Sequence, residues 1–215
     1  MNGNSTLINE LYISRKNILK YLKKINYNTE NIEKFTLSEI NAMKNNTQSD
    51  VSELNFDVYK NDNPDEKCTV YYYLKTSIKK SAIQNIVSDY YLDSDELKKK
   101  NNLIIITLGN INDTIKNTIS ELWSKYREYV VVYNIKNLLY NILEHKYVLE
   151  HTKLTLEEKE ELFKKYNINN DNELPEISII DPMAKLILLK PSEVCKILRY
   201  EQNAYLTEYY RICKI

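Results

Sequence analysis

The sequence predicts an α/β protein of two domains, over residues 1–145 and 146–215. In the first domain, two apolar runs at 102–108 and 129–133 flank a segment with helical spacing. Runs that are apolar at nearly every position indicate strands buried on both faces, and the order strand, helix, strand indicates a parallel crossover unit. In the second domain, a β-branched run precedes a helix, and two alternating polar and apolar segments follow. This order is typical of a small mixed α/β domain.

Two amphipathic helices are predicted first. Between residues 7 and 25, apolar residues recur near helical spacing, with Lys and Arg between them. Thr36 and Glu39 have the spacing of a capping box, in which each side chain accepts a hydrogen bond from the other residue's backbone amide. A second, shorter helix is therefore expected to start here. The apolar residues expected on one face of this helix are Leu37, Ile40 and Met43.

A β-hairpin and the first half of the crossover unit are predicted next. Residues 54–59 alternate, residues 61–65 form a turn cluster, and residues 68–74 are rich in β-formers. Helical spacing returns over residues 77–91, before the first buried strand, which Gly109 ends.

The crossover helix and the domain boundary follow. The helix is expected over residues 115–126, and residues 134–145 are expected to form a helical exit from the first domain. Residues 146–153 show no clear period, so the domain boundary is placed at their start. Thr155 and Glu158 have the spacing of another capping box, which opens the first helix of the second domain.

Each element predicted for the last stretch, residues 174–215, follows from a local sequence signal. Residues 177–180 are a short strand, Asp181 can cap a helix, and Pro182 suits the first helical position. This helix must end by Lys190, because Pro191 cannot continue it and restricts its predecessor. The two half-buried strands expected after it are 193–199 and 209–215, joined by a polar loop.

Composition and charge exclude several classes of function. Thirty basic and thirty acidic residues cancel, so no global attraction to nucleic acid or membrane is available and any DNA contact must be local. No apolar run approaches the roughly 20 residues of a membrane helix, and the polar start lacks a signal-peptide pattern, so a soluble intracellular protein is expected. Abundant Asn, Lys, Ile and Tyr suit an AT-rich coding genome.

Three cysteines and two histidines offer no metal site by their spacing. No Cys-x-x-Cys occurs, and neither His145 nor His151 lies near a cysteine, which indicates a reducing compartment and no zinc. Cys195 and Cys213 fall on the two C-terminal strands and are expected to be small buried hydrophobes. We expect no cofactor.

Several short motifs of the last stretch occur in a characteristic order. They are Leu174-Pro175, Asp181-Pro182-Met183-Ala184, Leu189-Lys190, Glu193-Val194, Lys196-Ile197, Arg199 and Tyr210-Arg211-Ile212. No single motif is specific, but together they resemble the C-terminal assembly domain of the fifth subunit common to the eukaryotic nuclear DNA-directed RNA polymerases, a family that also has an archaeal member. The resemblance extends back to Val148, with Leu149 standing where that family has proline.

The resemblance implies a noncatalytic subunit of a multisubunit DNA-directed RNA polymerase. In the eukaryotic members an N-terminal α/β jaw domain, a restriction-endonuclease-like sheet with flanking helices, lies along the downstream duplex DNA. Residues 1–145 have a suitable length and element order for that jaw, and residues 146–215 for the assembly domain. The composition suits a large DNA virus or an AT-rich protist. The implied location is the nucleus for a cellular protein, and a virion or cytoplasmic viral replication site for a viral one.

The resemblance also implies docking on the largest polymerase subunit. The candidate residues are Asp181, Pro182, Lys190, Glu193, Arg199, Tyr210 and Arg211. A small domain has little core to spare, so some of these residues must also fix its turns. His151 is either a residue that docks the two domains or an ordinary surface histidine. The family has glycines in two loops where this chain has none, at 188–192 and 201–205, which leaves the contacts of these loops open.

A nuclease of the related fold would need an acid on one strand and acid-x-Lys on the next, to hold a divalent metal and orient water. Asp57 lies on the first hairpin strand, but Tyr73-Leu74-Lys75 has tyrosine in the place of the acid. Pro64-Asp65 with Glu96-Leu97-Lys98 fits only by its letters, in a turn and a charged segment. We expect no catalytic residue. The alternatives are an endonuclease-like nucleic-acid-binding protein, inactive or active, outside a polymerase, and a stand-alone interaction module.

Local DNA contact is expected at the turn before the crossover helix. Backbone amides and the helix dipole at such a turn can hold a phosphate. The candidate residues are Asn110, Asn112, Thr114 and Lys116. Asp113 would repel phosphate and is alternatively the helix cap. Lys98-Lys99-Lys100 is a second candidate, although such runs are usually solvated. Phosphate contacts of this kind carry no sequence information and depend strongly on salt.

Overall fold

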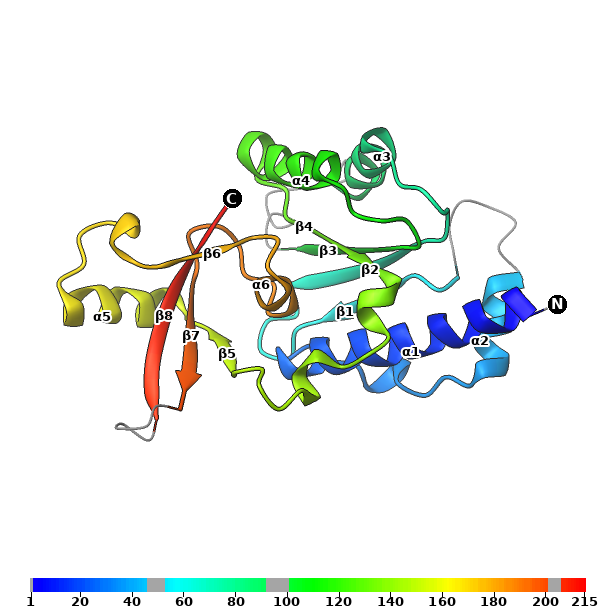
Figure 1. Ribbon diagram of the computed structural model, residues 1–215, viewed down its shortest axis with the longest axis horizontal. Helices are drawn as coiled ribbons and strands as arrows, with labels where there is room; N and C mark the ends of the chain where they lie inside the picture. The colour runs from blue at the N-terminus through cyan, green and yellow to red at the C-terminus, as the bar shows by residue number, and fades with distance from the viewer. Residues whose placement is uncertain (1, 46–52, 92–100, 201–205) are drawn as a thin grey trace. The chain divides into compact units, whose positions relative to one another are not determined.

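Two four-stranded sheets organise the chain in the computed structural model, which describes residues 2–45, 53–91, 101–200 and 206–215 (Figure 1). The chain divides into two compact units, Met1–Asn141 and Ile142–Ile215. Each unit contains one sheet. In the part of the chain that is described, no helix is both long and apolar enough to cross a membrane.

The first unit is an α/β sandwich of three layers. Its strands lie in the order β1-β2-β3-β4, with α3 and α4 on one face and α1 and α2 on the other (Figure 1). The elements are α1 (Asn2–Lys24), α2 (Leu37–Asn45), β1 (Phe56–Tyr59), β2 (Lys67–Tyr73), α3 (Lys80–Tyr91), β3 (Asn102–Thr107), α4 (Asp113–Tyr126) and β4 (Val130–Asn134), with the 3₁₀ turns η1 (Glu30–Ile32) and η3 (Ile135–Leu138).

The predicted hairpin and parallel crossover are confirmed. β1 pairs antiparallel with β2, while β2 with β3 and β3 with β4 are parallel. Every residue of β3 and of β4 is buried, as expected for strands covered on both faces. The apolar runs therefore form the centre of this unit.

Arg15 is a buried charge that joins α1 to the hairpin. Its guanidinium lies between the rings of Phe35 and Phe56, at 4.5 and 4.4 Å from their centroids. It also donates a hydrogen bond of 2.7 Å to the Leu54 carbonyl. Burial lowers the pKa of this guanidinium. In place of water, the two rings supply cation–π attraction and the carbonyl accepts a hydrogen bond.

The predicted apolar face of α2 is covered only in part, since Leu37, its first residue, is 47% exposed whereas Ile40 is fully buried. Another expectation for the first unit needs correction. The expected exit helix over 134–145 is instead the 3₁₀ turn η3 and, in the second unit, η4 (Ile142–Glu144). The Asn134 side chain accepts a hydrogen bond from the Lys136 amide and so caps the N-terminus of η3. The 3₁₀ segment stays short, as such segments usually do.

The second unit is a mixed sheet in the order β5-β7-β8-β6 (Figure 1). Its remaining elements are β5 (His151–Lys153), α5 (Leu156–Tyr166), η5 (Asp171–Glu173), β6 (Glu176–Ser178), α6 (Pro182–Leu186), β7 (Val194–Arg199) and β8 (Thr207–Lys214). β7 is antiparallel to β5 and β8, and β6 is parallel to β8. The predicted strands and helices are confirmed, but β5 was missed, because three residues are too few to show a period.

The two faces of this sheet are buried differently. Leu162 of α5 packs with Val194 and Ile212 on one face. Cys195 and Cys213 are fully buried on the other face, where the Cys213 thiol donates to the Leu189 carbonyl at 3.5 Å. Burial raises the pKa of Cys195 to about 11 and that of Cys213 to about 12. These cysteines are free and buried, as the sequence predicts.

The predicted helix caps are confirmed. In the Thr36 and Thr155 boxes, each threonine amide donates to the partner glutamate at 2.7 Å, and the glutamate amide donates back to the threonine hydroxyl. Asp181 accepts from the Met183 amide at 2.8 Å and starts α6. The loop that was expected over 201–205 lies outside the described residues.

Helix α6 ends in a turn without glycine. Leu188 has φ 50°, and its amide donates to the Lys185 carbonyl at 3.2 Å. The Leu189 amide donates to the Ala184 carbonyl at 2.9 Å. This pattern is a Schellman motif with leucine at the left-handed position that glycine usually fills. Ser192, with φ 71°, is a second such position.

Gly109 lies where the turn after β3 passes close to the loop after β2. A Cβ at this position would lie 3.1 Å from backbone atoms of Thr76, Ser77 and Ile78. We expect Gly109→Ala to lower the free energy of unfolding by about 1–3 kcal/mol, because backbone must shift to admit the methyl group. Chemical denaturation followed by circular dichroism measures this change.

Asn117→Ala on α4 is the matched control for this substitution. Asn117 is exposed, and alanine favours a helix, so its unfolding midpoint should be unchanged or slightly raised. Equal midpoints for Gly109→Ala and the unchanged chain would contradict the steric argument.

Candidate functional site

The turn between β3 and α4 carries the four residues predicted to lie near DNA. Asn112 is the helix cap, and its side-chain oxygen accepts from the Ile115 amide at 3.1 Å. Asp113, the alternative cap, is instead the first helical residue and pairs with Lys116 at 2.8 Å. The hydrogen bond from Lys116 holds the pKa of the Asp113 carboxyl below its usual range. The Lys116 charge is therefore partly offset within the turn. Asn110, Asn112 and Thr114 are exposed.

Asn134, which sequence reasoning missed, holds this turn from the neighbouring strand. Its side-chain amide donates to the Gly109 carbonyl at 2.8 Å and lies 3.4 Å from the Asn110 side-chain oxygen. Parallel strands end at the same edge of a sheet, so the ends of β3 and β4 meet here. In the sequence, Asn134 could have been noticed as the polar residue that directly follows the apolar run of β4.

The nuclease pattern is not assembled around Asp57. Asp57 lies opposite Thr69 on β2, accepts from the Thr69 hydroxyl at 2.5 Å and pairs with Lys67 at 2.7 Å. Tyr73 lies four residues beyond Thr69 on β2, about 13 Å away at roughly 3.3 Å per residue. Lys75 contacts the Tyr73 ring, 5.7 Å from its centroid. Asp57 is thus engaged in ion pairing across the hairpin.

The alternative letters of the nuclease pattern are described only in part. Pro64 and Asp65 lie in the hairpin turn, as expected. Glu96-Leu97-Lys98 and the lysine run 98–100 lie outside the described residues. Among the residues that the structure does describe, no three His, Cys, Asp or Glu side chains are placed to hold a metal ion.

Four of the seven predicted partner-binding residues shape turns of the second unit. Asp181 caps α6, and Pro182 occupies its first turn. One Glu193 carboxylate oxygen accepts from the Lys190 amide at 2.7 Å, and the other pairs with Lys153 at 2.7 Å. Pro182 is exposed, and the other three are half-buried. These residues therefore have structural roles, and their contact with a partner stays a prediction.

The other three predicted residues lie on the β7–β8 ladder and face opposite sides. Tyr210 faces α5, where its ring centroid is 6.2 Å from that of Tyr166 and its hydroxyl donates to Glu208 at 2.5 Å. Arg199 and Arg211 face the other side, because strand residues alternate. The predicted set is divided between two faces, and its role in binding stays a prediction.

Tyr209, which sequence reasoning passed over, lies between these two arginines. The Arg199 and Arg211 guanidinium carbons lie 4.5 and 5.6 Å from the centroid of its ring. Tyr209 pairs with Ile197 across the ladder. The sequence could have indicated this contact, because Tyr209 lies two residues before Arg211 on the predicted strand and so on the same face of it.

His151 is the half-buried first residue of β5. Its Nδ1 lies 2.9 Å from the Leu149 carbonyl, and a carbonyl only accepts, so Nδ1 carries the proton. His151 is thus tied to its own segment of the chain. Domain docking by this residue stays a prediction.

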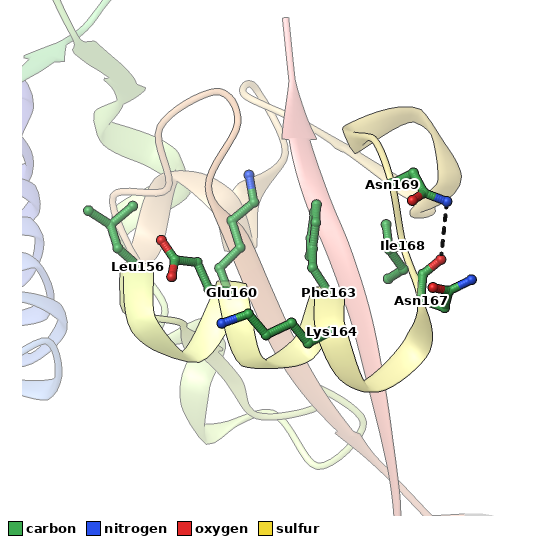
Figure 2. Close-up of a pocket in the computed structure, with 8 residues that line it drawn as sticks. Leu156, Glu160, Phe163, Lys164, Asn167, Ile168 and Asn169 are labelled. Atoms are coloured by element: carbon green, nitrogen blue, oxygen red, sulfur yellow. Dashed lines mark hydrogen bonds between the residues drawn. The ribbon is translucent and has the colours of Figure 1, made fainter.

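An open groove runs alongside α5 and is lined by residues of this helix and of the segment that follows it (Figure 2). Leu156 is 80% exposed at one end, and Phe163 and Ile168 line the groove while also packing against the core. Lys159 lies over the Phe163 ring and pairs with Asp171 at 3.0 Å. The groove thus combines apolar side chains with paired charges.

Comparison with known proteins gives matches over both units. A family model described as RNA polymerase Rpb5, C-terminal domain, matches residues 140–213. A Dictyostelium discoideum protein named DNA-directed RNA polymerases I, II, and III subunit rpabc1 is 31% identical over 170 residues, which are 77% of this chain and 82% of that protein.

Two further relatives extend the comparison. A Caenorhabditis briggsae protein named DNA-directed RNA polymerases I, II, and III subunit RPABC1 is 30% identical over 71% of this chain and 69% of its own length. An Aeropyrum pernix protein named DNA-directed RNA polymerase subunit Rpo5 is 41% identical over 70 residues, which are 33% of this chain and 77% of that protein.

Proposed function

The chain belongs to the family of the fifth common subunit of DNA-directed RNA polymerases, and we propose that its second unit docks on the largest polymerase subunit while its first unit forms a lower jaw beside the downstream duplex DNA. The chain is thus a polymerase subunit, and its partners include other polymerase subunits. The observation that carries the proposal is the alignment of 170 residues, 77% of the chain, since it is longer than the second unit alone.

The role that we propose is noncatalytic. Nucleotidyl transfer would belong to the large subunits, and two kinds of candidate side chain among the described residues are poorly suited to catalysis. Asp57 pairs with Lys67, and the buried thiols of Cys195 and Cys213 have raised pKa values, which makes them poor nucleophiles at neutral pH. An endonuclease-like protein acting outside a polymerase is not favoured by the relatives.

Location follows the polymerase. We propose the nucleus for a cellular source, and a virion or a cytoplasmic viral replication site for a viral source. The DNA contact that we propose is to phosphates of the downstream duplex, independent of its sequence, near the turn between β3 and α4.

Assembly is tested by affinity purification of the tagged chain from its native source. We expect two very large polymerase subunits to be recovered with it in stoichiometric amounts, measured by gel densitometry and mass spectrometry. Recovery of a monodisperse free chain without these subunits would overturn the proposed function.

Absence of nuclease activity is tested on the purified chain with duplex DNA and Mg²⁺. We expect no cleavage above background by the unchanged chain or by Asp57→Ala, because Asp57 has no acidic partner at Tyr73. Mg²⁺-dependent cleavage that Asp57→Ala abolishes would show that the chain is itself a nuclease.

DNA contact at the turn is tested with Lys116→Glu in the assembled polymerase. Loss of one phosphate contact should weaken crosslinking to downstream DNA and reduce the slope of log affinity against log salt by about 1. Lys125→Glu, in the last turn of the same helix, is the control and should leave both unchanged. If the two variants behave alike, the turn does not contact DNA.

A further inference from the structure

Two arginines and a tyrosine form a compact group on one face of the β7–β8 hairpin. The Tyr209 ring has the Arg199 guanidinium 4.5 Å and the Arg211 guanidinium 5.6 Å from its centroid. Cation–π contact with the ring restrains both planar groups. We call Arg199, Tyr209 and Arg211 the arginine clamp. All three side chains are half-buried, so the guanidiniums are partly shielded from water.

The clamp carries positive charge that its surroundings leave uncompensated. Within the described part of the chain, no carboxylate forms an ion pair with either guanidinium. Arg211 donates one long hydrogen bond, 3.4 Å, to the Glu176 carbonyl, and its buried Nε has no acceptor. The buried Nε is out of reach of an external group, but an arginine offers five donors, and both side chains are only half-buried. The clamp therefore has capacity for an external acceptor.

The opposite face of the same hairpin provides a contrast. There Lys196 pairs with Glu208 at 3.4 Å, and Lys214 lies 3.8 Å from Glu176. On the face of the clamp, Lys153 pairs with Glu193 at 2.7 Å. Lysines of this sheet thus have acidic partners within the second unit. The two clamp arginines differ from them in this respect.

The chemistry of the clamp favours a carboxylate as its acceptor. Guanidinium groups match a planar carboxylate through two parallel hydrogen bonds. Nucleic acid is a weaker fit, because affinity for it depends on many phosphate contacts, whereas this chain has a net charge of zero and the clamp holds two cations. Arginine and tyrosine are also enriched at the centres of protein interfaces.

Resting on the polymerase assembly described above, we propose that the arginine clamp binds an Asp or Glu side chain of another polymerase subunit. The carboxylate would accept hydrogen bonds from Arg199 and Arg211, and the Tyr209 ring would hold the two guanidiniums in place. In this proposal, two of the predicted partner-binding residues, Arg199 and Arg211, bind the same carboxylate from one face of the sheet. Tyr210 lies on the other face and takes no part in the clamp.

The test titrates the 215-residue chain into purified polymerase that lacks it. We expect the double variant Arg199→Gln/Arg211→Gln to bind about tenfold more weakly or worse, since charged hydrogen bonds are lost, and to show a smaller dependence on salt. Tyr209→Leu should weaken binding, whereas Tyr209→Phe, which keeps the ring, should not. Lys196→Gln on the opposite face is the matched control and should bind normally, and thermal unfolding checks that each variant folds.

The acidic partner is identified by zero-length crosslinking. In Arg199→Lys and Arg211→Lys chains, a carbodiimide should join the new amine to an Asp or Glu of another subunit, located by mass spectrometry. Failure of the unchanged chain to bind the polymerase would overturn the proposed function and the clamp together. Normal binding by the double variant, with no such crosslink, would overturn the clamp alone. So would a double variant that loses affinity for labelled duplex or single-stranded DNA while binding the polymerase normally.

Discussion

A β-strand presents successive side chains to opposite faces of its sheet, and this constraint decides what the second unit can do. In the β7–β8 ladder, Val194 pairs with Ile212, and Cys195 pairs with Arg211. The first pair packs against α5, and the second lies on the face of the arginine clamp. A shift of one residue would exchange the two faces. One register therefore specifies both the hydrophobic core of the unit and the surface that we assign to a partner.

The first unit depends on a related constraint, the meeting of parallel strands at one edge. Asn134 at the end of β4 binds the turn that follows β3, and Gly109 lets that turn pass close to the loop after β2. The turn is thus shaped by neutral hydrogen bonds and steric fit, while Asp113 and Lys116 offset each other's charge. Because the protein has no net charge, any contact with nucleic acid would have to come from such local arrangements and not from overall attraction.

Most of the fold could be predicted from the sequence, because its signals are local. Buried apolar runs, two capping boxes and the Asp181-Pro182 pair each have a cause within a few residues. The three-residue β5 could not be predicted, since its only support is pairing with β7. The candidate sites were harder to predict from the sequence. Asn134 and Tyr209 act through partners on neighbouring strands, and Tyr210 proved to face away from Arg211. Which side chains meet depends on the register of the strands and on which face of the sheet a helix covers. No short sequence motif encodes either of these.

The glycine-free turns around α6 bear on the unfolded chain as well as on the folded one. Leu188 and Ser192 adopt left-handed backbone conformations that cost a residue with a side chain about 1–2 kcal/mol each. A leucine or serine also samples far fewer conformations than glycine before folding, so it loses less entropy when the turn forms. Strain in the native turn is therefore offset in part by a less flexible denatured ensemble. In a chain with two glycines in 215 residues, the net cost of these turns is therefore the difference between the strain in the folded state and the entropy saved on folding.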